Sequence, residues 1–171
     1  AEVQHAMDGI NHWKGLDMPV APVTIMGSAL AIFLGFRNNS AYDRWCEARK
    51  IWGGIVNTSR TLSSYVMTFP SSKHGDASES EIGKWKSSLI RRQICWLYAL
   101  KAHLRKQTNW EMMKEWLSDE EYELLMKKSN KPAQLIHNQN QAIAFAYENG
   151  MIDNFRHIEL AEQIKTLYDL Q

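Results

Sequence analysis

The feature that most constrains this chain is a run of 19 residues without a charged side chain, Met18–Phe36. As a helix the run is about 28 Å long, which is close to the roughly 30 Å hydrocarbon core of a bilayer. Pro19 and Pro22 suit the first turn of a helix, where a missing N–H costs nothing. The run therefore predicts a transmembrane helix over residues 18–36. A helix buried in a soluble protein is the alternative, and the mean hydropathy of −0.42 favours it.

Charges are distributed unequally on the two sides of the run. The cations that follow it closely are Arg37, Arg44, Arg49 and Lys50, whereas Lys14 precedes it. Because cytoplasmic flanks of membrane helices carry an excess of Lys and Arg, the pattern predicts a cytoplasmic segment 37–171. Residues 1–17 are then an extracytoplasmic loop.

Two sets of residues recur every four positions within the run. One set is small and lets neighbouring helices approach closely in a membrane: Gly27, Ala31 and Gly35. The other lies on the adjacent face: Ser28, Ile32 and Phe36. If several copies surrounded an axis, this second face would form a narrow apolar constriction that excludes water. Ordinary core packing explains both sets equally well.

The rest of the chain predicts an all-α fold, because periodic apolar residues fit helices and no segment alternates as a strand does. The first helix is expected to be long, over 23–69, with Asn38 and Gly53 as candidate bend points. Its amphipathic part, 42–66, carries an apolar stripe that includes Trp45, Trp52, Ile55, Leu62 and Val66. A polar, mobile loop is expected at 70–82, followed by cytosolic helices at 82–107, 110–128, 132–149 and 154–170.

Local signals mark several helix ends. Ser118 and Asp153 (or Asn154) fit N-cap positions, Pro132 fits a first turn and Gly150 fits a helix end. We also expect Gly53 and Gly54 to weaken the first helix and to permit close approach of a neighbour.

The charge balance and the absence of known motifs argue against several classes of protein. With 20 basic and 19 acidic residues, the chain lacks the charge of a nucleic-acid-binding protein. Cys46 and Cys95 have no spacing that suits zinc, and we expect two reduced thiols. Asp43 and Glu47 lie one helical turn apart and are expected to pair with nearby Arg and Lys side chains. The sequence contains no motif of an enzyme, a metal site or a cofactor site.

A longer motif adds to this interpretation. The stretch Ala31–Gly53 reads AIFLGFRNNSAYDRWCEARKIWG and resembles the signature of the bestrophin family in its bacterial branch. The residues that carry the motif are Arg37, Asn38, Asn39, Tyr42, Asp43, Arg44, Trp45, Glu47, Arg49 and Trp52. The resemblance implies a homopentameric, multi-pass ion channel of the cell inner membrane whose pore is lined by this helix. Animal members resemble calcium-activated chloride channels, and some bacterial members are implied to favour monovalent cations.

The same resemblance implies the site residues. The family's neck consists of three apolar rings, which fall on Ser28, Ile32 and Phe36, and Ser28 departs from the apolar residue usual there. A second constriction at the cytosolic exit falls on Phe155, through the local match ENGMIDNF. Identical subunits, the lipid bilayer and monovalent ions are the implied partners.

Family subunits have four membrane-crossing regions, and this chain contains only the pore helix, so we expect an internal fragment of a subunit. No calcium ligand can be assigned on it. Two alternatives stay open at this point. One is a soluble helical adaptor that buries residues 18–36 against a partner, and the other is an enzyme at a membrane surface.

Overall fold

A computed structural model describes residues 20–72 and 77–171 of the chain. These residues form helices and contain no strand, which confirms the all-α prediction. The chain divides into two units, Ala1–Arg49 and Lys50–Gln171, and each is described by itself. The predicted extracytoplasmic loop 1–17, the first two residues of the predicted membrane helix and residues 73–76 lie outside the described residues.

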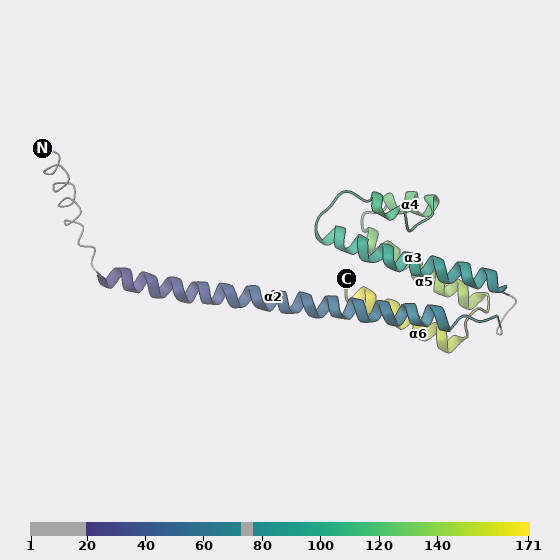
Figure 1. The fold of residues 1–171 in the computed structure, drawn as a ribbon, viewed down its shortest axis with the longest axis horizontal. Coiled ribbons are helices and arrows are strands. Elements are labelled where there is room, and N and C mark those ends of the chain that lie inside the picture. The colour runs from purple at the N-terminus through teal and green to yellow at the C-terminus, as the bar shows by residue number, and fades with distance from the viewer. Residues whose placement is uncertain (1–19, 73–76) are drawn as a thin grey trace, which may run out of the picture. The chain divides into compact units, whose positions relative to one another are not determined.

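The first described element is a single long helix, α2 (Val20–Thr68, 49 residues), shown in Figure 1. At 1.5 Å per residue it is about 73 Å long. It begins three residues before the predicted start and runs without interruption through both Asn38 and Gly53. Pro70 follows its end, where a helix cannot continue because Pro lacks the required N–H.

The helix α3 (Glu79–Leu104) begins earlier than predicted. The Ser78 side chain accepts from the backbone N–H of Glu81, and the Glu81 carboxylate accepts from the backbone N–H of Ser78 at 2.9 Å. This reciprocal capping box satisfies donors that a helix start leaves free. Residues 79–82 are therefore helical and do not belong to the predicted loop. The helix also ends earlier than predicted, and Lys106 just beyond it has a φ of 53°.

The segment 110–128 is not one helix, which contradicts that prediction, but the predicted N-cap at Ser118 is confirmed. It contains a 3-10 turn, η1 (Glu111–Met113), and a separate helix, α4 (Asp119–Met126). Ser118 between them has extended backbone angles, φ −70° and ψ 157°, and its Oγ accepts from the Glu121 N–H. A residue that caps a new helix in this way cannot continue an earlier one.

The last two helices confirm the local end signals. The helix α5 (Lys131–Glu148) has Pro132 in its first turn, and Gly150 follows its end with a φ of 65°. Such a positive φ favours glycine because a Cβ would clash. The helix α6 (Asn154–Asp169) is capped by Asp153, whose side chain accepts from the Arg156 N–H.

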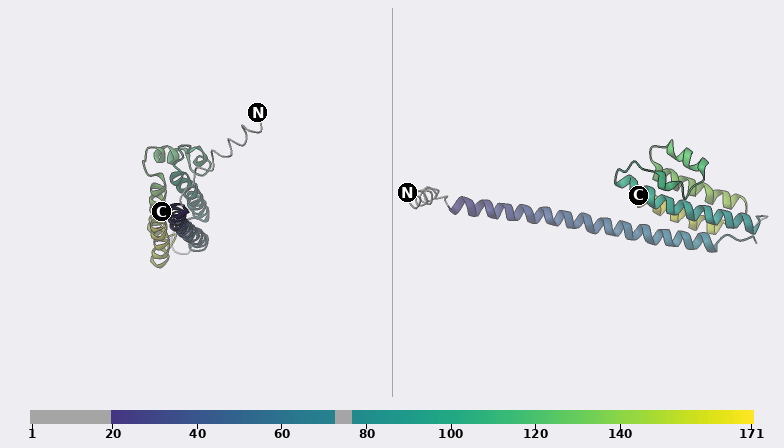
Figure 2. Two further views of the ribbon diagram at one scale, coloured as in Figure 1. Left: turned by 90° about the vertical axis from the view of Figure 1, so that its left-hand side faces the viewer. Right: turned by 45° about the horizontal axis from the view of Figure 1, so that its top comes forward.

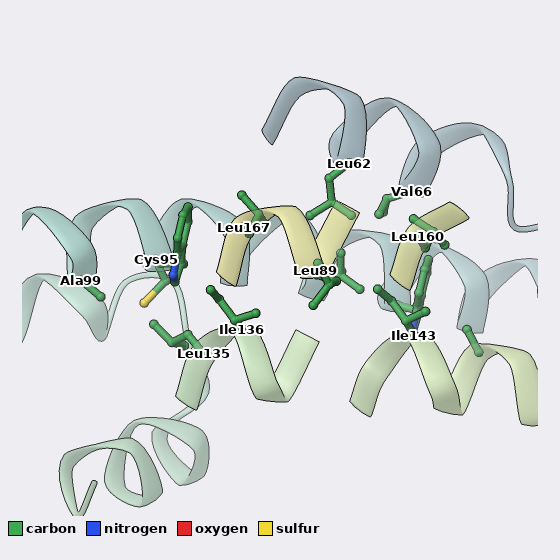
Figure 3. Close-up of a cluster of buried hydrophobic side chains, with 14 of the residues drawn as sticks. Leu62, Val66, Leu89, Cys95, Ala99, Leu135, Ile136, Ile143, Leu160 and Leu167 are labelled. Atoms are coloured by element: carbon green, nitrogen blue, oxygen red, sulfur yellow. The ribbon is translucent and has the colours of Figure 1, made fainter. Parts of the chain in front are cut away.

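The core of the second unit lies between α3, α5, α6 and the end of α2. The helices α3, α5 and α6 run side by side (Figure 1 and Figure 2). In Figure 3, Leu62 and Val66 of α2 lie over side chains from the other helices, with Leu89 near the centre. The predicted stripe of 42–66 is thus buried only in its later part, while Trp45 and Trp52 are exposed.

Polar groups are also present in this core. The Trp85 indole Nε1 donates to the Ala142 carbonyl at 2.7 Å and joins α3 to α5. Gln93 Nε2 donates to Ser59 Oγ at 2.8 Å and joins α3 to α2. Among the described residues, three buried amide atoms have no protein partner: Gln93 Oε1, Gln139 Oε1 and Gln139 Nε2.

Candidate functional site

The predicted neck lies on the part of α2 that belongs to the first unit. From Ala21 to Arg49 every side chain is exposed except that of Cys46, which is partly buried. Ile32 is 61% exposed and Phe36 is 69% exposed. Covering a side chain of this size contributes about 1.5–3 kcal/mol, so this surface strongly favours an apolar environment.

The spacing of four residues places Ser28, Ile32 and Phe36 on one face of α2, because side chains at i and i+4 lie above one another. Leu34 follows Ile32 by two residues and therefore lies about 200° around the helix, on the opposite side. A substitution at Leu34 can therefore serve as a control for substitutions in the predicted neck, because it changes the same apolar segment on the opposite side of the helix.

The hydroxyl groups beside the neck are satisfied within the helix. Ser28 Oγ donates to the Thr24 carbonyl at 2.9 Å, and Ser40 Oγ donates to the Phe36 carbonyl at 3.0 Å. Each proton is therefore already used by the backbone, and what remains on each oxygen is acceptor capacity. Because its proton is bound to the Thr24 carbonyl, Ser28 makes the apolar stripe less polar than a serine with a free hydroxyl proton would.

The predicted packing face has room for a neighbour. A Cβ added at Gly27 or at Gly35 would meet nothing within 4 Å. Within the described part of the chain, nothing occupies the space above these two glycines. The close approach that small residues permit therefore requires another segment or another copy.

The motif residues after the neck continue along α2 and are exposed. The rings of Tyr42 and Trp45 have centroids 6.0 Å apart, and the Arg49 guanidinium lies 5.5 Å from the Trp45 ring centroid. Among residues 20–72 and 77–171, neither Asp43 nor Glu47 forms an ion pair, contrary to the expected pairing with nearby cations. The described residues also contain no group of His, Cys, Asp and Glu arranged to hold a metal ion.

The predicted exit residue, Phe155, lies in the first turn of α6 in the second unit. Its side chain is 70% exposed, and Ile158, one turn later, is also exposed. The other apolar side chains of α6, Leu160, Ile164 and Leu167, are buried in the core. The exposed pair therefore points away from the packing face of its own helix.

Two basic side chains that sequence reasoning did not single out bind the end of α2. Lys86 Nζ donates to the Met67 carbonyl at 2.8 Å, and Arg156 Nη1 donates to the Phe69 carbonyl at 3.2 Å. Carbonyls at a helix end lack partners within the helix, and cations are favourable there. The distance along the chain between these groups explains why no sequence pattern indicated the contacts.

A groove between α3, α4 and α5 was also not predicted. A polar network joins its walls: Arg92 Nε donates to Glu121 Oε1, Asn138 Nδ2 donates to the same oxygen, and Gln134 Nε2 donates to Asn138 Oδ1. Each member of the network finds its partner within the chain. The network therefore serves to join three helices.

The fold and the exposed helix together define a class of protein. One helix among the described residues, over Ala21–Thr68, is long and apolar enough to cross a membrane, and its most apolar part has a mean hydropathy of 1.2 with none of it buried. The second unit is a helical bundle with its own core. The class is therefore an all-helical protein with one candidate membrane-spanning helix.

Within that class, residues 3–171 match the family described as bacterial and fungal bestrophin proteins, and the chain belongs to this family. The voltage-dependent anion channel-forming protein YneE of Escherichia coli (strain K12) is 32% identical over 154 residues, which are 90% of this chain and 47% of that protein. The voltage-dependent anion channel-forming protein sll1024 of Synechocystis is 25% identical over 153 residues, 90% of this chain and 48% of its own length. The chain thus spans about half the length of these relatives.

Solved structures show the same fold. A variant of a bacterial bestrophin homolog from Klebsiella pneumoniae has a TM-score of 0.79 and 23% identity, covering 93% of this chain and 57% of that one. A variant described as a membrane protein gives a TM-score of 0.80, also at 23% identity, over 93% of this chain and 56% of its own length. The family match over residues 3–171 confirms the resemblance that the Ala31–Gly53 motif indicated.

Proposed function

We propose that this chain is part of an ion-channel subunit through which small monovalent ions pass passively. The observation that carries the proposal is the exposed apolar face of α2, with Ile32 and Phe36 on one stripe. The family supports it, because two relatives of this chain are named as anion channel-forming proteins. These names also favour anions over cations, and they point away from an enzyme.

In this proposal residues 18–36 cross the inner membrane, residues 1–17 lie outside the cytoplasm and residues 37–171 lie within it. The full-length protein is a multi-pass membrane protein. Its α2 helix packs against identical copies through Gly27, Ala31 and Gly35, in a homopentamer. The motif residues from Arg37 to Trp52 continue the same helix beyond the membrane. Lipid covers the side of α2 that faces away from the axis.

The neck consists of rings of Ser28, Ile32 and Phe36. An ion that passes a narrow apolar ring loses part of its hydration shell, and no polar group in the ring replaces the lost water. The barrier therefore depends on the width of the ring and on the apolar area that lines it. Phe155 forms a second ring at the cytosolic exit, where its exposed side chain is available to the path.

The test is single-channel recording from the full-length protein in planar bilayers. Ile32→Ala and Phe36→Ala remove apolar volume from the neck and are expected to raise the conductance. Leu34→Ala is the matched control, because it removes similar volume from the opposite side of α2 and is expected to leave conductance unchanged. Currents that do not differ between the neck variants and the wild type would contradict the neck. A full-length protein that is monomeric and soluble without detergent would support the adaptor alternative.

A further inference from the structure

The end of α2 and the start of α6 are joined by several contacts within the second unit. Ser71 N donates to the Met151 carbonyl at 3.1 Å, so the chain that leaves α2 is bonded to the chain that enters α6. Met151 and Ile152 are buried beside this bond. The short segment before α6 is therefore held against the end of the long helix.

Arg156 makes the side-chain part of this junction. Its Nη1 donates to the Phe69 carbonyl at 3.2 Å, and its guanidinium carbon lies 5.9 Å from the centroid of the Phe69 ring. Phe69 is itself stacked on Tyr65 of α2, with centroids 4.4 Å apart. A guanidinium both donates hydrogen bonds and stacks on an aromatic ring, which an ammonium does less well.

The same arginine is fixed within its own helix. Its backbone N–H donates to Asp153 Oδ1 at 2.8 Å, and its Nε lies 3.6 Å from Asp153 Oδ2. Asp153 is the N-cap of α6, so one carboxylate orients both the first turn of the helix and the guanidinium. Phe155 lies between these two residues in the sequence, and its side chain is 70% exposed within the described part of the chain.

We infer that Arg156 is a positioning residue for the cytosolic exit ring. By binding Phe69 at the end of α2, it fixes the turn of α6 that carries Phe155 and so sets the width of the exit. The inference rests on the proposed function, because it requires that Phe155 lines the ion path. It extends that function by naming the contact that connects the pore-lining helix to the exit.

The test compares variants of the full-length protein by the permeability of large relative to small ions of the same charge. Phe155→Ala is expected to raise this ratio. Arg156→Gln is expected to raise it by about two- to threefold, because a freed first turn no longer holds the ring narrow. Arg156→Lys keeps the charge but cannot both donate to the Phe69 carbonyl and stack on the Phe69 ring as a guanidinium does. It is expected to raise the permeability ratio less than Arg156→Gln does. In the Phe155→Ala background, Arg156→Gln is expected to add nothing.

Lys86→Met is the matched control, because Lys86 also binds a carbonyl at the end of α2 but belongs to α3. It is expected to lower the Tm in detergent while leaving the permeability ratio unchanged, which separates a structural role from a positioning one. If Arg156→Gln does not assemble, Arg156→Lys decides the question by the same comparison.

Three results would overturn the inference alone. The first is an unchanged permeability ratio in the Arg156 variants. The others are an increase as large as that of Arg156→Gln in the wild type, seen either when Arg156→Gln is added to Phe155→Ala or in Lys86→Met. An unchanged ratio in Phe155→Ala would instead remove the exit ring from the proposed function, and the inference with it.

Discussion

The Nε of Arg92 on α3 lies 2.6 Å from Oε1 of Glu121 on α4, and both side chains are mostly shielded, with 21% and 16% of their surfaces exposed. Asn138 of α5 donates to the same oxygen at 3.3 Å. One carboxylate therefore accepts from two helices while it belongs to a third.

This arrangement predicts that Glu121→Gln lowers the free energy of unfolding and weakens the attachment of α4. The variant removes the charge that Arg92 faces, and a hydrogen bond to a charged group contributes about 1.5–3 kcal/mol when it is well formed. We expect a loss of that size in unfolding free energy and faster hydrogen exchange within α4. Glu120→Gln, a change at the neighbouring exposed position, is the control and is expected to have little effect. Equal effects of the two variants would contradict the prediction.

Cys95 is expected to be unreactive in the folded protein. Burial, and to a lesser extent the nearby Glu121 carboxylate, raises the pKa of its thiol to about 12. Fewer than about one Cys95 in ten thousand is then a thiolate at neutral pH, and the thiolate is the reactive form. Alkylation mapped by mass spectrometry should find Cys95 unmodified in the folded protein and modified after unfolding. Rapid modification of folded Cys95 would contradict the burial.

The capping box at α3 predicts a dependence on pH. Hydrogen bonds from Ser78 lower the pKa of Glu81 below its ordinary value of 4.5. Since the folded pKa is the lower one, the charged carboxylate stabilises the folded state above pH 4.5, and the contribution is lost as the pH falls through the folded pKa. Ser78→Ala should therefore destabilise the protein at neutral pH and do so less in acid. Denaturant unfolding at several pH values measures this, with Ser80→Ala as the control.

Two adjacent glycines of α2 are expected to respond differently to alanine. A Cβ at Gly54 would lie 3.0 Å from Cδ2 of Leu170, whereas a Cβ at Gly53 would meet nothing within 4 Å. Alanine in a helix interior is favoured over glycine by up to about 1 kcal/mol. Gly53→Ala should therefore raise the Tm, and Gly54→Ala should raise it less or lower it because Leu170 must move. Adding Leu170→Ala should remove the difference, and a persistent difference would contradict this explanation.

The positions of most helices followed from signals close in the sequence. Ser118, Pro132, Gly150 and Asp153 act on the backbone within a few residues, so each marked a helix end that the structure confirms. The 110–128 segment shows the limit of periodicity, because its apolar pattern fits one helix although η1 ends at Met113 and Ser118 caps a separate helix, α4. The loop before α3 is shorter than predicted, because the capping box formed by Ser78 and Glu81 starts the helix at Glu79.

Contacts between distant residues were not predictable in the same way. Arg156 and Phe69 are 87 positions apart, and no local pattern links them. Close approach to Gly54 was expected, but Leu170 as the neighbour was not. For the candidate site, the spacing of Ile32 and Phe36 placed them on one face of a helix. Their arrangement as rings depends on further copies of the chain, and it stays a prediction.

Gln139 is fully enclosed in the bundle, yet neither of its amide atoms meets a protein partner within the described residues. An unpaired enclosed amide costs about 1–3 kcal/mol relative to an apolar group of the same shape. A side chain of similar length without that requirement, such as methionine, is therefore expected to make the bundle melt at a higher temperature. Gln139 thus marks a position on α5 at which one substitution is expected to increase the resistance of the bundle to heat.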